Sequence, residues 1–312
     1  MRSSVTGLHL LIFLLLIRKD FPKSFISLVP LIKFLVMKQI LLSAVILLCV
    51  STNLFAQHSV TKLWETDTLL KVPESVLLDA DNNVLYVSNI NGTDGWAKDG
   101  NGSIGKIGLD GKIIAVDWVT GLNSPKGLGM YKGKLLAADI DEIVVIDIKK
   151  GVIERKVPIE GAKGLNDISI GSDGIVWVSD SKNNVIYRVN NDRSSVYVQN
   201  LKGANGVLKR GNDFFIVDAG SVLKVNDDKT VTKISDGMEG GTDGIENFTG
   251  NDFLVSCWQG ALWYVHADGK KELLFDGKAQ NTNTADIGFD PKTNIVYVPT
   301  FFRNSVIAFQ VK

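Results

Sequence analysis

Cysteine and histidine are scarce in this chain of 312 residues, which holds two cysteines and three histidines. Cys49 lies in an apolar run near the N-terminus, so Cys257 is the only cysteine beyond it and no disulfide can form within the rest of the chain. Cys257 stands in the strand-like run FLVSCW, and we expect it to be a buried packing residue. The few histidines and the lack of a G-x-S-x-G sequence argue against a serine hydrolase triad. A catalyst built on this chain would therefore depend on a metal ion.

A basic surface is also missing once the N-terminus is set apart. Residues 57–312 carry 28 of the 34 basic side chains and 33 of the 34 acidic ones, so this part is mildly acidic. Proteins that bind nucleic acids present a basic face or stripe. We therefore expect no nucleic-acid partner.

Long apolar runs are confined to the N-terminal residues. Met37 and Lys38 precede the run ILLSAVILLCV and the segment STNLFA, which gives the basic, apolar and small-residue regions of a signal peptide in order. We expect residues 37–56 to be a signal peptide cleaved after Ala56. The protein would then be exported to the periplasm or the exterior, without an integral membrane domain in the mature chain.

Residues 1–36 do not fit a membrane span. The apolar run over residues 8–17 is too short to cross a bilayer, and a second run is interrupted by Pro30 and Lys33. We interpret residues 1–36 as an extension upstream of the true start at Met37. The alternative is an N-terminal membrane anchor that runs through residue 55.

Beyond residue 57 the chain shows no helical periodicity, and short runs rich in Val, Ile, Tyr and Trp alternate with Gly, Asn and Asp. One pattern recurs six times: a polar opening, an apolar strand, a turn, a second apolar strand and a small or polar stop. The six copies begin at Glu74, Lys126, Asn166, Asn205, Asp243 and Ala285. Their spacing is about 40 residues after one longer first interval, which is the length of a propeller blade. The sequence predicts an all-β fold in which residues 57–312 form one six-bladed β-propeller.

The ends of this region predict how the ring closes. VTKLWET over residues 60–66 is a lone strand before the first repeat, and NSVIAFQV over residues 304–311 is the last strand. Pairing the N-terminal strand into the last blade would remove two open sheet edges. We therefore expect closure at this blade.

The opening position of each repeat should face the central channel, because equivalent positions of the blades converge there. Four of the six openings offer a carboxylate or amide oxygen, namely Glu74, Asn166, Asn205 and Asp243. Singly, Asn and Asp at such places are explained by turn capping. Four together on one ring favour a divalent metal with oxygen ligands, above all Ca²⁺, with Zn²⁺, Mn²⁺ or Mg²⁺ as alternatives. Neither His58 nor His266 stands at an opening, so a histidine-based zinc site is not expected.

The motifs P-E-S at 73–75, L-N-D at 165–167, A-N-G at 204–206 and T-D-G at 242–244 resemble the metal-site signatures of the regucalcin/gluconolactonase family. That family, also known as senescence marker protein-like, includes relatives such as diisopropyl fluorophosphatase. The resemblance spans about residues 60–312, and the order and spacing of the motifs carry it. It implies a six-bladed propeller with the metal ligands Glu74, Asn166, Asn205 and Asp243. It also implies that Asp167 lies close to the metal.

Two departures from the family pattern concern the substrate. Sugar-acid lactonases of the family carry Arg two residues before the first Asn, where this chain has Gly164; phosphotriesterase-type relatives carry a channel His where this chain has Gly288. Lys126 and Asp286 on the ring are candidate substrate contacts, although a solvated loop lysine is an equal interpretation. Trp96, in the long first interval, either packs in the ordinary way, which we favour, or overhangs the channel mouth.

Two functions remain open from the sequence. The first is a metal-dependent lactone or ester hydrolase that acts on a small molecule as a monomer, with Asp243 or Asp167 as the base. The second is an exported, non-catalytic binding or scaffold propeller that holds a structural calcium ion. A propeller fold alone does not decide between them.

Overall fold

The computed structural model describes residues 34, 36–39 and 57–312. The chain divides into the units Met1–Ala56 and Gln57–Lys312, and all six β-sheets belong to the second unit. The signal peptide and the upstream extension lie almost wholly outside the described residues, so both stay predictions. None of the helices in the described ranges is long and apolar enough to cross a membrane.

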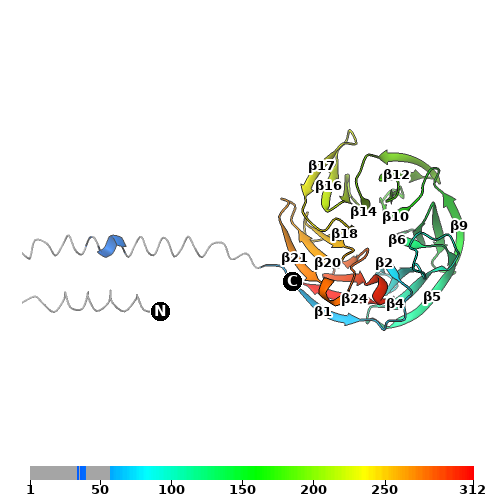
Figure 1. The fold of residues 1–312 in the computed structure, drawn as a ribbon, viewed down its shortest axis with the longest axis horizontal. Helices are drawn as coiled ribbons and strands as arrows, with labels where there is room; N and C mark the ends of the chain where they lie inside the picture. The colour runs from blue at the N-terminus through cyan, green and yellow to red at the C-terminus, as the bar shows by residue number, and fades with distance from the viewer. Residues whose placement is uncertain (1–33, 35, 40–56) are drawn as a thin grey trace, which may run out of the picture. The chain divides into compact units, whose positions relative to one another are not determined.

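Six four-stranded antiparallel sheets surround a central axis as the blades of a propeller (Figure 1). Blade 1 consists of β2 (Pro73–Asp79), β3 (Val84–Asn89), β4 (Gly102–Gly108) and β5 (Ile113–Leu122). Blade 2 consists of β6 (Pro125–Tyr131), β7 (Lys134–Asp139), β8 (Glu142–Asp147) and β9 (Val152–Pro158). Blade 3 consists of β10 (Leu165–Ile170), β11 (Val176–Asp180), β12 (Val185–Asn190) and β13 (Arg193–Val198).

The second half of the ring repeats this plan. Blade 4 consists of β14 (Ala204–Arg210), β15 (Asp213–Asp218), β16 (Ser221–Val225) and β17 (Val231–Ser235). Blade 5 consists of β18 (Thr242–Asn247), β19 (Phe253–Cys257), β20 (Ala261–Val265) and β21 (Lys271–Asp276). Blade 6 consists of β22 (Gly288–Asp290), β23 (Ile295–Pro299), β24 (Val306–Val311) and β1 (Val60–Glu65). The predicted six-bladed fold is confirmed.

The core lies between the blades. Each of six clusters of buried apolar side chains joins two neighbouring blades, and the sixth joins blade 6 to blade 1 through residues such as Tyr297 and Leu85. Second strands such as β3, β11 and β19 are buried along their whole length, which explains why each begins with an uninterrupted apolar run, VLYV, VWV and FLV. Cys257 ends β19 and is fully buried, as expected for a packing thiol.

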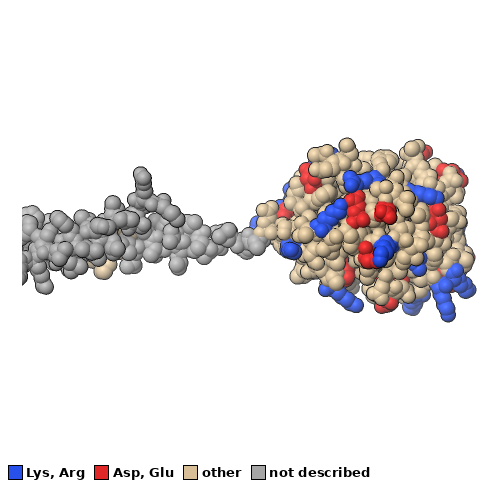
Figure 2. All heavy atoms as spheres, turned by 90° about the horizontal axis from the view of Figure 1, so that it is seen from below, with Lys and Arg blue, Asp and Glu red and all other residues tan. Residues whose placement is uncertain are grey.

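The N-terminal strand closes the ring, as the sequence predicts. β1 pairs antiparallel with β24, from Val60 opposite Val311 to Glu65 opposite Ile307. The C-terminus accordingly lies beside β1 in Figure 1. Around the rim, basic and acidic side chains are interspersed on the side shown in Figure 2.

Glu65, the last residue of β1, fastens this strand to blade 6. Its carboxylate accepts hydrogen bonds from Arg303 Nε and Ser305 Oγ, both at 2.8 Å. Burial by itself would raise the pKa of Glu65, but the bonds from Arg303, Lys62 and Ser305 outweigh burial and lower this pKa to about 2. The ionised carboxylate is therefore the form that stabilises the closed ring.

We predict that Glu65→Gln lowers the free energy of unfolding by about 1–3 kcal/mol at neutral pH, the contribution of hydrogen bonds to a charged group. Because folding lowers the pKa of Glu65, this contribution is complete above the usual value of 4.5 and is lost as the pH falls toward about 2. Urea unfolding across this range measures the effect. Glu154→Gln, on the exposed surface, is the matched control and should change little. An equal loss in both variants would contradict a special role for Glu65.

Candidate functional site

The predicted ring residues share one structural position. Glu74, Lys126, Asn166, Asn205 and Asp243 are each the second residue of the innermost strand of their blade. At this position the pairing with the second strand is interrupted in all five blades, for example between Leu165 and Ile168. Such bulges redirect side chains and are common beside functional sites. Inner strands of neighbouring blades are in contact, so the five bulges form one ring around the axis.

Serine hydroxyls of the second strands hold three of these bulges in place. Ser179 Oγ accepts the backbone N–H of Asp167 at 2.9 Å, and Ser256 Oγ accepts that of Gly244 at 2.8 Å. Ser88 does the same for Ser75. A bulge frees an amide from the strand ladder, and a buried amide needs a partner. The serines supply this partner, which fixes the backbone next to the ring residues.

Aspartates at the ends of second strands fix the loops that lead into the ring. Asp139 accepts the backbone N–H groups of Asn123 and Ser124, both at 2.8 Å, just before β6. Asp218 accepts those of Lys202 and Gly203 before β14. These contacts set the point at which each inner strand begins. They explain why a small or acidic residue ends several of the repeated segments.

Glycines after the ring residues allow the blades to approach closely. A Cβ atom added to Gly206 would lie 2.3 Å from the carbonyl oxygen of Asp243, and one added to Gly127 would lie 2.5 Å from Cα of Asp167. Any side chain at these places would push neighbouring blades apart. The tight packing therefore accounts for Gly at these positions and keeps the ring narrow.

Two buried oxygens on the ring lack a hydrogen-bond partner among the described residues, Glu74 Oε2 and Asn205 Oδ1. The amide nitrogen of Asn205 donates to Asp243 Oδ1 at 3.0 Å, which leaves the carbonyl oxygen unused. Asn166 is held similarly, because its amide nitrogen donates to Ser181 Oγ at 3.0 Å. A buried polar atom without a partner is costly, and such orphans often mark the place of an ion or water. Both orphans belong to residues that the sequence analysis singled out as ligands.

The ring concentrates buried negative charge. Burial, followed by the charge of Asp286, raises the pKa of Glu74 to about 8 against the opposing effect of Lys126. Burial and the charges of Glu74 and Asp286 likewise raise the pKa of Asp243 well above its usual range. Buried carboxyl groups that interact in this way resist ionising together, and a cation at the ring would remove this resistance.

Asp167 and Asp286 are engaged with the backbone or with neighbouring blades. The two carboxylate oxygens of Asp167 accept the backbone N–H groups of Ile168 and Val207, at 2.6 and 2.7 Å. Asp286 Oδ2 accepts the Ser75 hydroxyl at 2.5 Å, which joins blade 6 to blade 1. Both acids line a channel cavity of about 190 Å³.

Glu246 lines the same cavity, and burial raises its pKa to about 8. Glu246 is not among the site residues predicted from the sequence. Its only signal is a second acid, three residues after Asp243, in the inner strand β18, which does not by itself indicate a channel position.

Lys126 is 3% exposed and stands on the ring among these acids. Burial lowers its pKa, while Glu74 and Asp243 act in the opposite direction. The ring of Trp96 lies 4.4 Å from Nζ of Lys126 and 4.8 Å from Nζ of Lys182. The interpretation of Lys126 as a solvated loop lysine is therefore wrong. Trp96 packs between these two lysine side chains, one of which belongs to the ring.

The structure explains why this chain has glycine at positions 164 and 288, where the family motifs have other residues. A Cβ atom at Gly288 would lie 2.4 Å from the carbonyl oxygen of Val76, so a histidine does not fit there. A Cβ atom at Gly164 would lie 2.7 Å from Cγ of Lys182 and 3.0 Å from the Trp96 ring. The space beside Gly164 is thus already filled by Trp96 and Lys182.

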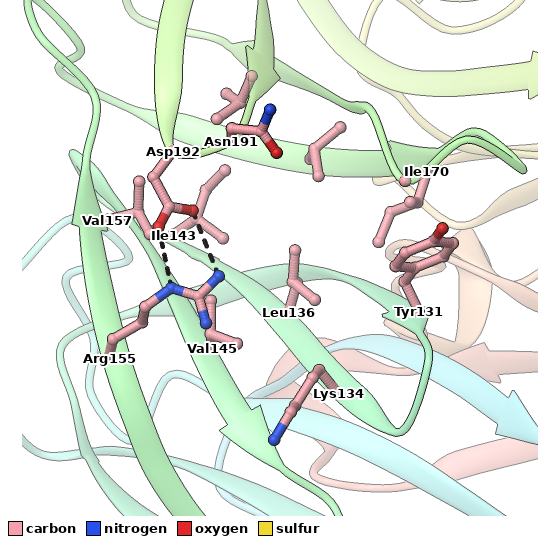
Figure 3. Close-up of a pocket in the computed structure, with 13 residues that line it drawn as sticks. Tyr131, Lys134, Leu136, Ile143, Val145, Arg155, Val157, Ile170, Asn191 and Asp192 are labelled. Carbon is pink, nitrogen blue, oxygen red and sulfur yellow. Dashed lines mark hydrogen bonds and ion pairs between the residues drawn. The ribbon is translucent and has the colours of Figure 1, made fainter.

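A second cavity, of about 210 Å³, lies between blades 2 and 3 and contains none of the ring residues (Figure 3). Its wall is mostly apolar, with Leu136 and Ile143 among the lining residues, and Arg155 pairs with Asp192 at one side. The one acid among the described residues that line this cavity, Asp192, is exposed. We therefore place the candidate site at the ring.

The ring residues fit a hard divalent cation. Glu74 and Asp243 offer carboxylates, and Asn166 and Asn205 offer amide oxygens whose nitrogens are already bound elsewhere. Ca²⁺ accepts six to eight oxygen ligands in flexible geometry, so four protein ligands leave positions for water or substrate.

No protein-family model matches the chain, and no curated protein matches its sequence. Solved structures do match. A streptogramin B lyase aligns with a TM-score of 0.62 and 12% identity, over 84% of this chain and 100% of that one. A virginiamycin B lyase from Staphylococcus aureus aligns with a TM-score of 0.61 and 14% identity, over 81% and 99%. A gluconolactonase from Xanthomonas campestris aligns with a TM-score of 0.62 and 13% identity, over 81% and 89%. The chain shares its six-bladed propeller fold with these lyases and with gluconolactonase.

We predict that Ca²⁺ stabilises the protein most strongly at high pH. Without metal, folding raises the pKa of Asp286 from 3.8 to about 7 and that of Glu74 from 4.5 to about 8. The free energy of unfolding should therefore fall as the pH rises from about 4.5 to about 8. Bound Ca²⁺ balances the ionised carboxylates, so the fall should disappear. Urea unfolding with Ca²⁺ or with chelator, at several pH values, measures this difference.

Glu74→Gln should weaken Ca²⁺ binding by about tenfold or more, because the number of charged ligands sets Ca²⁺ affinity. Glu246→Gln is the matched control, since it removes a buried carboxylate from the same channel but not from the ring. Equal Ca²⁺ affinity in both variants would contradict a metal at the ring.

Proposed function

We propose that this protein is a metal-dependent hydrolase of lactones or related esters, exported and active as a monomer. The observation that carries the proposal is the ring of oxygen donors, with Glu74 Oε2 and Asn205 Oδ1 buried and without partners. Similarity to the regucalcin/gluconolactonase motifs and the fold shared with a gluconolactonase add support. Ca²⁺ is the proposed metal, with Zn²⁺, Mn²⁺ and Mg²⁺ as alternatives.

Glu74, Asn166, Asn205 and Asp243 would hold the metal. When bound, a divalent cation polarises a substrate carbonyl and lowers the pKa of water at the site. The protein's own part is to present these four oxygens on rigid bulges. The cross-blade bond from Asn205 to Asp243 orients two of them together.

Asp243 is the proposed general base. One of its oxygens accepts from Asn205, and the other has no hydrogen-bond partner within the described residues, so it is free to take a proton from water. Asp167 is less suited, because backbone N–H groups occupy both of its oxygens. We therefore assign Asp167 to holding blades 3 and 4 together beside the site.

The mouth of the ring favours a substrate with an anionic group. Lys126 and Lys182 flank the Trp96 ring, and Lys126 Nζ makes no hydrogen bond with a described residue. A buried ammonium group of this kind can pair with a carboxylate of the substrate, while Trp96 offers an apolar surface. The arginine expected for sugar-acid lactonases is replaced by this Trp–Lys arrangement, so the proposed substrate is an anionic lactone or ester other than a simple sugar lactone.

The proposal is tested with a panel of lactones and aryl esters, with and without carboxylate groups, assayed with chelator and after Ca²⁺ is restored. Hydrolysis should incorporate oxygen from ¹⁸O-labelled water into the product. Two of the structures that share this fold are lyases. Ring opening without ¹⁸O incorporation would therefore indicate elimination instead. Tight Ca²⁺ binding with no turnover across the panel would favour the non-catalytic scaffold propeller.

Asp243→Asn keeps the size and one oxygen ligand but removes a charge and the proton acceptor. We predict a modest loss of Ca²⁺ affinity and a fall in turnover of roughly a hundred- to ten-thousand-fold at saturating Ca²⁺, the contribution of a positioned base. Steady-state kinetics of the active substrate, with Ca²⁺ binding measured in parallel, separate the two effects.

Asp167→Asn is the matched control. It should lower stability, because an amide nitrogen replaces one of the two acceptor oxygens and leaves one backbone N–H without its partner, while turnover of the folded protein remains mostly intact. The reverse pattern, with Asp243→Asn active and Asp167→Asn inactive, would move the base to Asp167.

A further inference from the structure

The only two histidines beyond residue 56, His58 and His266, meet in the folded chain although 208 positions separate them. His58 lies two residues before the start of β1, and His266 directly follows β20. Both contact one carboxylate oxygen: His266 Nε2 lies 2.7 Å from Glu272 Oε1, and His58 Nδ1 lies 3.2 Å from it. A histidine-based site was not expected from the sequence, because neither histidine stands at a blade opening.

These three ligand atoms lie within 4.8 Å of one another. Ligands at 2.0–2.2 Å from one zinc ion lie at most about 4.4 Å apart, so small side-chain rotations would bring all three to an ion. The side chains are 20–29% exposed, which leaves a path for an ion and a place for a water ligand. Two imidazoles and one carboxylate are a ligand set that late first-row transition metals prefer.

The surroundings hold these ligands in place. His58 stacks on Tyr264 with ring centres 3.6 Å apart, and its backbone N–H donates to Glu272 Oε2 at 2.7 Å. Asp252 Oδ2 lies 3.6 Å from His266 Nδ1 and accepts the Tyr264 hydroxyl. A carboxylate beside the second ring nitrogen of a histidine is the usual outer support of a metal ligand, because it fixes the tautomer and the ring orientation.

We propose that His58, His266 and Glu272 form a second metal site, for Zn²⁺ or a similar transition-metal ion, that latches the N-terminal strand to blade 5. β1 closes blade 6 by pairing with β24, while Glu272 and His266 belong to the outer part of blade 5. An ion at this place would join the two blades at the seam where the ring closes. The site is separate from the ring of oxygen donors and does not depend on the proposed hydrolase function.

The test uses the full chain purified without a histidine tag, stripped of metal and then saturated with Ca²⁺ so that the central ring is not available to zinc. Isothermal titration should show one Zn²⁺ ion per chain, and Co²⁺ should give visible absorption bands of a nitrogen–oxygen site. His266→Ala and His58→Ala should each weaken Zn²⁺ binding by at least tenfold. Zinc should also slow hydrogen exchange of the β1 amides and raise the melting temperature.

Asp268→Asn is the matched control for Glu272→Gln, because each removes one carboxylate close to His266 and only Glu272 belongs to the cluster. Glu272→Gln should weaken Zn²⁺ binding, and Asp268→Asn should not. Equal Zn²⁺ affinity in the wild type and in His266→Ala would overturn the site. Zn²⁺ binding that depends on both histidines but leaves hydrogen exchange of the β1 amides unchanged would overturn the proposal that the ion holds β1 to blade 5.

Discussion

The burial of several carboxyl groups side by side is the constraint on which the centre of this molecule depends. Six inner strands converge on one axis and bring Glu74, Asp243 and Asp286 together away from water, where Lys126 is the one basic side chain among the described ring residues. Burial raises the pKa values of all three acids, and like charge adds to this at Glu74 and Asp243, so the metal-free ring favours protonated carboxyl groups. A divalent cation would remove this conflict, and the same cation would give the ring its proposed chemistry.

The propeller holds the backbone beside the ring residues in a fixed position. Each ring side chain projects from a bulge whose amide or entry loop is fixed by a serine or aspartate of the next strand. Glycines such as Gly206 allow the backbones of neighbouring blades to touch. Because the inner strands of all six blades surround the axis, the geometry of the ring depends on closure by β1, which the contacts of Glu65 with Arg303 and Ser305 stabilise.

Much of this architecture could be predicted from the sequence, because a propeller repeats one local pattern. The spacing of the polar openings predicted the number of blades and the ring residues, and the lone strand at 60–66 predicted the closure. Contacts between unlike, distant segments could not be predicted. The Trp96 loop reaches Lys126 and Lys182 in other blades, and His58 meets His266 across the seam. No local periodicity encodes these contacts, since they follow from the closed shape.

Anomalous diffraction from crystals soaked with Mn²⁺ in place of Ca²⁺ tests the central claim most directly, because it locates the ion without any assay of activity. The account predicts a strong peak on the propeller axis within ligand distance of Glu74, Asn166, Asn205 and Asp243. An axis without such a peak at saturating Mn²⁺, or an ion bound there by other residues, would contradict it.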